Sequence, residues 1–121
     1  MTTPPATPPR PPSIPLAPAV RAAYRDLYNK YEAAIEDTTC PSVLAALNAS
    51  QAQVDDILTK DAMYRLHADT ALFQAILEQI NSTNADLAKL KAQIAAIASD
   101  MSTAGEIIGA INKVLSFFPG A

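Results

Sequence analysis

An apolar residue recurs every seven positions through the second half of the chain, and this repeat constrains the fold more than any other feature. The first row of the repeat consists of Leu66, Phe73, Ile80, Leu87, Ile94, Met101, Ile108 and Leu115. A second row, offset by three, consists of Ile76, Leu90, Ile97, Ile111 and Phe118, with exceptions at Asp69, Thr83 and Ala104. Spacings of three and four place both rows on one face of an α-helix, and a period of seven keeps that face against a neighbouring helix. Residues 66–118 are therefore predicted to be helical and packed lengthwise against other helices.

The remaining composition also favours helices. The chain has 121 residues, which is enough for one domain. Good helix formers dominate after residue 18, only three glycines occur, and no segment alternates β-branched and polar residues. The fold class expected is all-α, with a helical bundle domain over 18–121. The net charge of −3, with both signs interspersed, argues against a nucleic-acid surface.

The N-terminal segment 1–17 is predicted to be a disordered tail because it is rich in proline, which removes backbone donors and fixes φ. Pro5, Pro8 and Arg10 also fit the P-x-x-P-x-R pattern of SH3 ligands, a match that this density of proline readily produces by chance. The segment lacks the apolar core of a signal peptide, no stretch is apolar enough to span a membrane, and Cys40 is the only cysteine. A cytoplasmic location is expected.

Two turns divide the helical region in the favoured interpretation. Pro18 suits the first turn of a helix that ends near residue 37, and a loop at 37–41 separates it from a second helix. That helix is expected to continue through 59–61, although Thr59 and Asp61 could cap a break there. The second turn is placed at the four polar residues 81–84.

This second turn would give two helices of similar length, 42–80 and 84–118, as an antiparallel hairpin. The predicted architecture is a short N-terminal helix plus this long hairpin, a three-helix coiled-coil-like bundle. One continuous rod stays open as the alternative, because the heptad keeps its phase across 81–84. A kink or short break is expected near 102–105, where Gly105 weakens the helix and Thr103 with Glu106 resembles a capping box.

No residue pattern indicates catalysis, a cofactor or a metal. His67, the only histidine, has no ligand-type residue three or four positions away and is expected at the surface. Asp55 and Asp56 point about 100° apart on a helix, so they do not converge with Asp61 as a catalytic or calcium site. Cys40 has no base nearby in sequence and is interpreted as an incidental loop residue. The chain is therefore not expected to be an enzyme.

The wide apolar face of residues 107–118 is the feature most relevant to function. It is either the end of a bundle core packed against helix 18–37 or an exposed docking face. The residues predicted to bind a partner are Ile107, Ile111, Leu115 and Phe118, with Tyr24 and Tyr31 second. The expected function is a non-enzymatic helical protein–protein interaction module (an assembly, adaptor, chaperone-like or inhibitor protein) that binds a protein partner or itself.

The alternative function is a membrane-active helical protein, such as a component of a pore-forming toxin, that places its C-terminal helix on lipid. A helix lying on a membrane usually carries several basic residues on its polar side, whereas only Lys113 is present in 107–118. A membrane partner is therefore ranked behind a protein partner.

Overall fold

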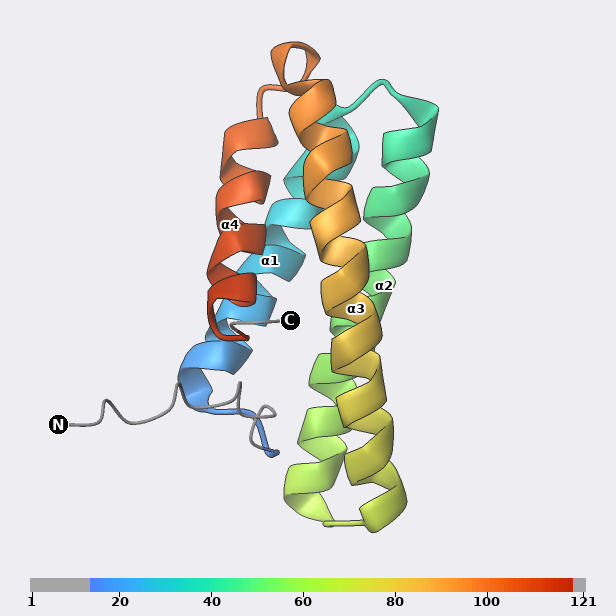
Figure 1. The fold of residues 1–121 in the computed structure, drawn as a ribbon, viewed down its shortest axis with the longest axis vertical. Coiled ribbons are helices and arrows are strands. Elements are labelled where there is room, and N and C mark those ends of the chain that lie inside the picture. The colour runs from blue at the N-terminus through green and yellow to red at the C-terminus, as the bar shows by residue number, and fades with distance from the viewer. Residues whose placement is uncertain (1–13, 119–121) are drawn as a thin grey trace, which may run out of the picture.

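The computed structural model describes residues 14–118, which form a bundle of four α-helices (Figure 1). The helices are α1 (Pro18–Asp37), α2 (Pro41–Leu66), α3 (Thr70–Ala96) and α4 (Ala104–Ser116), with a short 3-10 turn, η1 (Ala98–Asp100), before α4. No strand occurs within the described residues. The prediction of an all-α fold is confirmed.

The two central helices form a long hairpin that the two outer helices only partly cover. Helices α2 and α3 have 26 and 27 residues, whereas α1 has 20 and α4 has 13. Helix α1 packs against α2 and α4, and α3 packs against α2 and α4. At 1.5 Å per residue the hairpin is about 40 Å long and α4 only about 20 Å. The closed end of the hairpin therefore projects beyond α4 (Figure 1).

The starts of the helices follow from local sequence. Pro18 lies in the first turn of α1, as predicted, and Pro41 lies in the first turn of α2, where a missing backbone N–H loses no helical hydrogen bond. Asp69 caps α3, because its carboxylate accepts hydrogen bonds from the amides of Ala71 (2.7 Å) and Leu72 (3.2 Å). Helix α2 passes through residues 59–61 without a break, also as predicted, and ends at Leu66.

The predicted turn at residues 81–84 is wrong, because all four residues lie inside α3. Thr83 and Asn84 face the interior, and Asn84 Oδ1 accepts a hydrogen bond of 3.1 Å from the hydroxyl of Tyr24. A buried polar residue such as Asn84 is stable inside a helix when a partner from another helix satisfies it, whereas the hydroxyl of Thr83 is buried without a hydrogen-bond partner. The chain instead turns at residues 67–69, so the proposed helices 42–80 and 84–118 are replaced by α2, α3 and α4.

The break expected near 102–105 is present slightly earlier, over residues 97–103. Thr103 precedes α4, but the predicted capping box with Glu106 does not form. The carboxylate of Asp37, at the end of α1, accepts hydrogen bonds from the amide (2.9 Å) and hydroxyl (3.0 Å) of Thr103 and from the hydroxyl of Ser102 (3.1 Å). These bonds lower the pKa of Asp37, the bond from the Thr103 amide most of all.

The apolar rows of the repeat supply much of the core between the four helices. The buried members are Ile76, Ile80, Leu87, Leu90, Ile94, Met101, Ile111 and Phe118. Leu16 is also buried, so residues 14–17 belong to the folded domain. The prediction of a disordered tail does not hold for these four residues. The rest of that prediction, for residues 1–13, lies outside the described residues.

Candidate functional site

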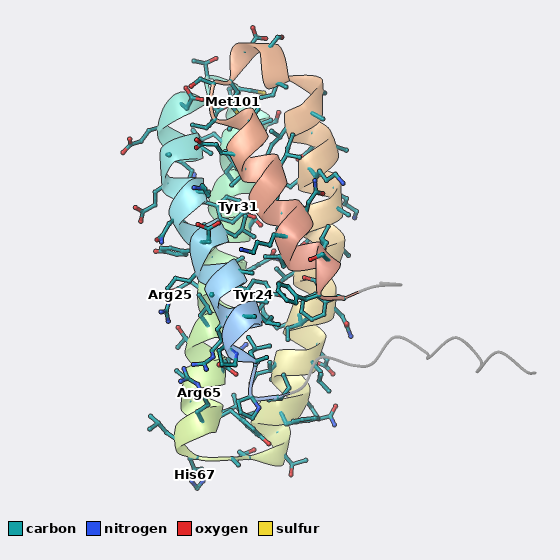
Figure 2. All side chains as sticks on the ribbon, turned by 90° about the vertical axis from the view of Figure 1, so that its left-hand side faces the viewer. Tyr24, Arg25, Tyr31, Arg65, His67 and Met101 are labelled. Atoms are coloured by element: carbon teal, nitrogen blue, oxygen red, sulfur yellow. The ribbon has the colours of Figure 1, made fainter. Side chains whose placement is uncertain are left out.

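The six residues predicted to bind a partner lie in or against the core. Figure 2 shows the labelled Tyr24 and Tyr31 between the helices. Both are fully buried, as are Ile107 and Ile111, while Phe118 is 8% exposed and Leu115 is half-buried. Helix α4 presents its apolar face to α1, in agreement with the core interpretation of residues 107–118. A partner would reach this face only if α4 left the bundle.

The two tyrosines point inward, and their hydroxyls are buried with the rings. Tyr24 donates to Asn84, and the hydroxyls of Tyr31 and Ser50 are 2.6 Å apart. Burial raises the pKa of both phenols well above the ordinary value of 10.0. Both tyrosines are therefore neutral, hydrogen-bonded parts of the core.

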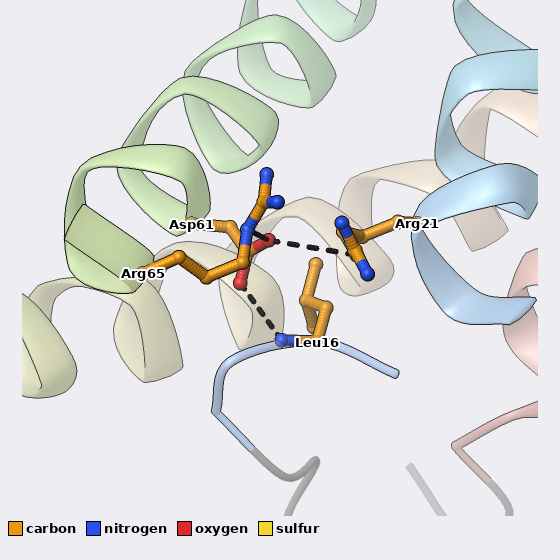
Figure 3. Close-up of polar contacts among 4 residues, drawn as sticks. All are labelled: Leu16, Arg21, Asp61 and Arg65. Carbon is orange, nitrogen blue, oxygen red and sulfur yellow. Dashed lines mark hydrogen bonds and ion pairs between the residues drawn. The ribbon is translucent and has the colours of Figure 1, made fainter. Parts of the chain in front are cut away.

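Asp61 is a fully buried carboxylate at the seam between α1 and α2 (Figure 3). One oxygen accepts a hydrogen bond of 2.7 Å from the amide of Leu16, and the other lies 3.2 Å from Nε of Arg65 and 4.0 Å from Nε of Arg21. Both arginine side chains are partly exposed, at 26% for Arg21 and 39% for Arg65. The carboxylate thus attaches the entry segment and α1 to α2.

Sequence reasoning missed this role of Asp61, although the sequence contains a signal for it. The buried residues of α2 follow spacings of four and three: Val43, Leu47, Ser50, Val54, Ile57 and Asp61. Asp61 takes the next inward position of that series, where a charged residue needs partners.

No catalytic or metal site is predicted at the other polar residues, which are His67, Asp55, Asp56 and Cys40. His67 is exposed at the end of α2, as expected. Within residues 14–118 no group of three His, Cys, Asp or Glu side chains is placed to hold a metal ion. Cys40 is half-buried, and its pKa is lowered chiefly by a hydrogen bond with the hydroxyl of Ser42.

An open groove runs along the outside of the bundle between α1 and α2, with a volume of about 570 Å³. Its apolar lining includes Tyr28 from α1 and Leu58, Met63 and Leu66 from α2. Met63 is 53% exposed and Leu66 is 89% exposed, the two highest values among the large apolar residues described. Large apolar side chains grouped in an exposed groove are typical of binding surfaces. We call this feature the α1–α2 groove.

The sequence assigned Leu66 to the buried stripe because it falls in the first row of the heptad. It is exposed because α2 ends there and the chain reverses, so no neighbouring helix covers its side. None of the helices within residues 14–118 is both long and apolar enough to cross a lipid bilayer.

No protein-family model, curated protein or solved structure matches this chain at a significant level. Function is therefore inferred from the residues of the chain and their geometry.

Proposed function

We propose that this protein is a non-enzymatic helical interaction module that binds another protein through helix-on-helix contacts in the α1–α2 groove. An assembly, adaptor, chaperone-like or inhibitor role would use such contacts. The observation that carries the proposal is the exposure of Met63 and Leu66 side by side in a concave surface. These residues are three positions apart at the end of α2 and so lie on one face of the helix.

The groove replaces the C-terminal face as the proposed binding surface. The apolar side of α4 is already covered by α1, whereas the α1–α2 groove leaves large apolar side chains in contact with water. Methionine adapts its shape to different partners, and a leucine at the end of a helix can insert between the side chains of a docking helix. Covering such side chains contributes roughly 25 cal/mol per Å² of apolar area removed from water.

A site-specific photocrosslinker tests the proposal. A benzophenone amino acid is placed at Met63 in the groove or, as the matched control, at Ala88, which is exposed on α3. Each variant is irradiated in an extract of the source cells. The expected result is a discrete adduct from position 63 that is absent from position 88.

The adduct should also disappear when Leu66→Ser is added to the variant labelled at 63. Equal adducts from both positions, or an adduct at 63 that Leu66→Ser leaves unchanged, would contradict binding in the groove. Circular dichroism of Leu66→Ser serves as the folding control, because a side chain that is 89% exposed can be made polar without loss of core packing.

A further inference from the structure

The charges beside the α1–α2 groove indicate the kind of partner that fits it. The chain contains four arginines, and three of them, Arg21, Arg25 and Arg65, lie along this seam. Arg25 lines the groove, Arg21 lies one helical turn before it on α1, and Arg65 adjoins Leu66 on α2. Figure 2 shows the labelled Arg25 and Arg65 on the same flank of the molecule.

The charges of the groove lining balance, with Arg25 against Asp55. At the adjoining part of the seam, Arg21 and Arg65 share the single carboxylate of Asp61, which leaves one excess positive charge beside the groove. The net charge of the chain is −3. The excess is concentrated toward the end of the groove that holds Met63 and Leu66, about 16 Å from Asp55 along α2 at 1.5 Å per residue.

The arginines keep donors that the fold does not use. Arg21 and Arg65 approach Asp61 through their Nε atoms, and Figure 3 shows the guanidinium end of Arg65 directed away from that carboxylate. Arg25 is exposed and forms no ion pair within residues 14–118. Arg65 lies in the last turn of α2, where its positive charge interacts favourably with the negative end of the helix dipole. This interaction does not occupy the terminal N–H groups of its guanidinium.

We infer that the α1–α2 groove receives an amphipathic helix of a partner protein that carries carboxylates beside its apolar face. This inference rests on the proposed function. Two antiparallel helices leave a groove into which a third helix packs, and guanidinium groups match carboxylates as two-point donors. The apolar face of the partner covers Met63 and Leu66, and its carboxylates meet the arginines.

A protein helix fits these observations better than the two other occupants. Binding to an anionic membrane favours a convex or flat surface with many basic residues, whereas this surface is concave and Asp55 lines one end. A second copy of the chain would present its own arginines at the same seam, since a two-fold dimer uses one surface twice, and like charges would then be close together.

Three stapled 18-residue peptides test the inference by fluorescence anisotropy. They share one Leu/Ile face and one helicity and differ only in the flanking residues, which are Glu, Gln or Lys. At 50 mM salt the Glu peptide is expected to bind about ten times more tightly than the Gln peptide, and at 500 mM salt this ratio should fall to about three or less. The Lys peptide should bind most weakly at both salt concentrations.

Variants of the protein assign the charge effect to the groove. Arg25→Gln should weaken the Glu peptide about two- to five-fold and leave the Gln peptide unchanged. Lys113→Gln, at an exposed position on α4, removes the same charge elsewhere and should change neither affinity. Leu66→Ser should weaken the Glu and Gln peptides alike.

Equal affinities for the Glu and Gln peptides would overturn the charge inference and leave the proposed function intact. The same holds if no peptide binds while the crosslink at Met63 still forms. Sedimentation with phosphatidylglycerol vesicles that depends on Arg25, without peptide binding, would overturn it in favour of lipid. A dimer in light scattering that Leu66→Ser dissociates would overturn it in favour of a second copy.

Discussion

Replacing Ser50 by alanine is expected to destabilise the protein more than replacing Tyr31 by phenylalanine, although both changes remove the same buried hydrogen bond. The two hydroxyl oxygens are 2.6 Å apart, Tyr31 is fully buried and Ser50 is 4% exposed. The difference arises from what each remaining hydroxyl can do after its partner is lost.

In Ser50→Ala the phenol of Tyr31 keeps its position because the ring is packed on all sides. Its hydroxyl is then buried without a partner, which costs about 2 kcal/mol. In Tyr31→Phe the smaller Ser50 side chain can rotate and donate to the main-chain carbonyl of Ala46, one turn earlier in α2. That rescue limits the loss to about 1 kcal/mol. The double variant leaves no unpaired hydroxyl, so its loss should also be about 1 kcal/mol, and the coupling between the sites about 2 kcal/mol.

Urea unfolding followed by circular dichroism at 222 nm measures these differences, because the fold is helical. With a slope of about 2 kcal/mol per M, Ser50→Ala should lower the midpoint by about 1 M and leave the slope unchanged. Ser99→Ala, at an exposed serine, is the control and should change stability by about 0.5 kcal/mol or less. Additive single effects, or a larger loss in Tyr31→Phe than in Ser50→Ala, would refute this reasoning.

The burial of Tyr24 and Tyr31 also predicts an alkaline limit to stability. Burial raises the folded-state pKa of both phenols above the unfolded value of 10.0, so the neutral forms stabilise the fold. This stability is fully present below about pH 10 and is lost as the pH rises toward the folded pKa. Of the four tyrosines, two should ionise together with the loss of helix. Tyrosinate absorbance and circular dichroism measured in one titration would show this, and ionisation of all four in an intact fold would contradict it.

Three further outcomes are expected. Asp37→Ala should lower the melting temperature at pH 7, because the lowered pKa of Asp37 means that its bonds to Thr103 stabilise the fold at pH values above its ordinary pKa of 3.8. The difference from the wild type should vanish as acid protonates the carboxyl, and a difference that is independent of pH would contradict this. Leu16→Ala should cost about 2–3 kcal/mol in urea unfolding because Leu16 is buried, whereas a fully detached entry segment would make the change neutral. Spin labels at Ala75 and Ala92 should be about 25 Å apart by pulsed electron resonance, since both lie in α3, and a much shorter distance would restore the turn at 81–84.

The parts of the fold that local chemistry decides could be predicted from the sequence. Proline at the first turn located the start of α1, and the position of the loop between α1 and α2 was predicted correctly. The buried face of α1 depends only on residue spacing, because Tyr24, Leu27 and Tyr31 recur at intervals of three and four and all lie in the core. These features require no knowledge of which helix lies opposite.

The turn between the central helices could not be predicted in this way because two polar signals competed. Residues 81–84 are more polar than the true turn at 67–69, so composition favoured the wrong position. The polarity of Asn84 is explained by Tyr24, sixty residues away in sequence, and no local pattern reveals that contact. Asp69 was visible as an exception in the second apolar row, and that exception is the cap of α3.

The unbroken phase of the heptad was the more reliable signal, and its physical basis explains why. A helix that continues must keep its apolar side chains on one face, whereas a turn releases the following residues from that requirement. The phase held across residues 81–84, where α3 continues. At Leu66 the repeat begins with a side chain that is almost fully exposed, because the helix reverses there and its last turn has no neighbour. The repeat therefore located the buried face of α3 correctly. Its first member, Leu66, is exposed and is one of the apolar residues that line the proposed binding groove.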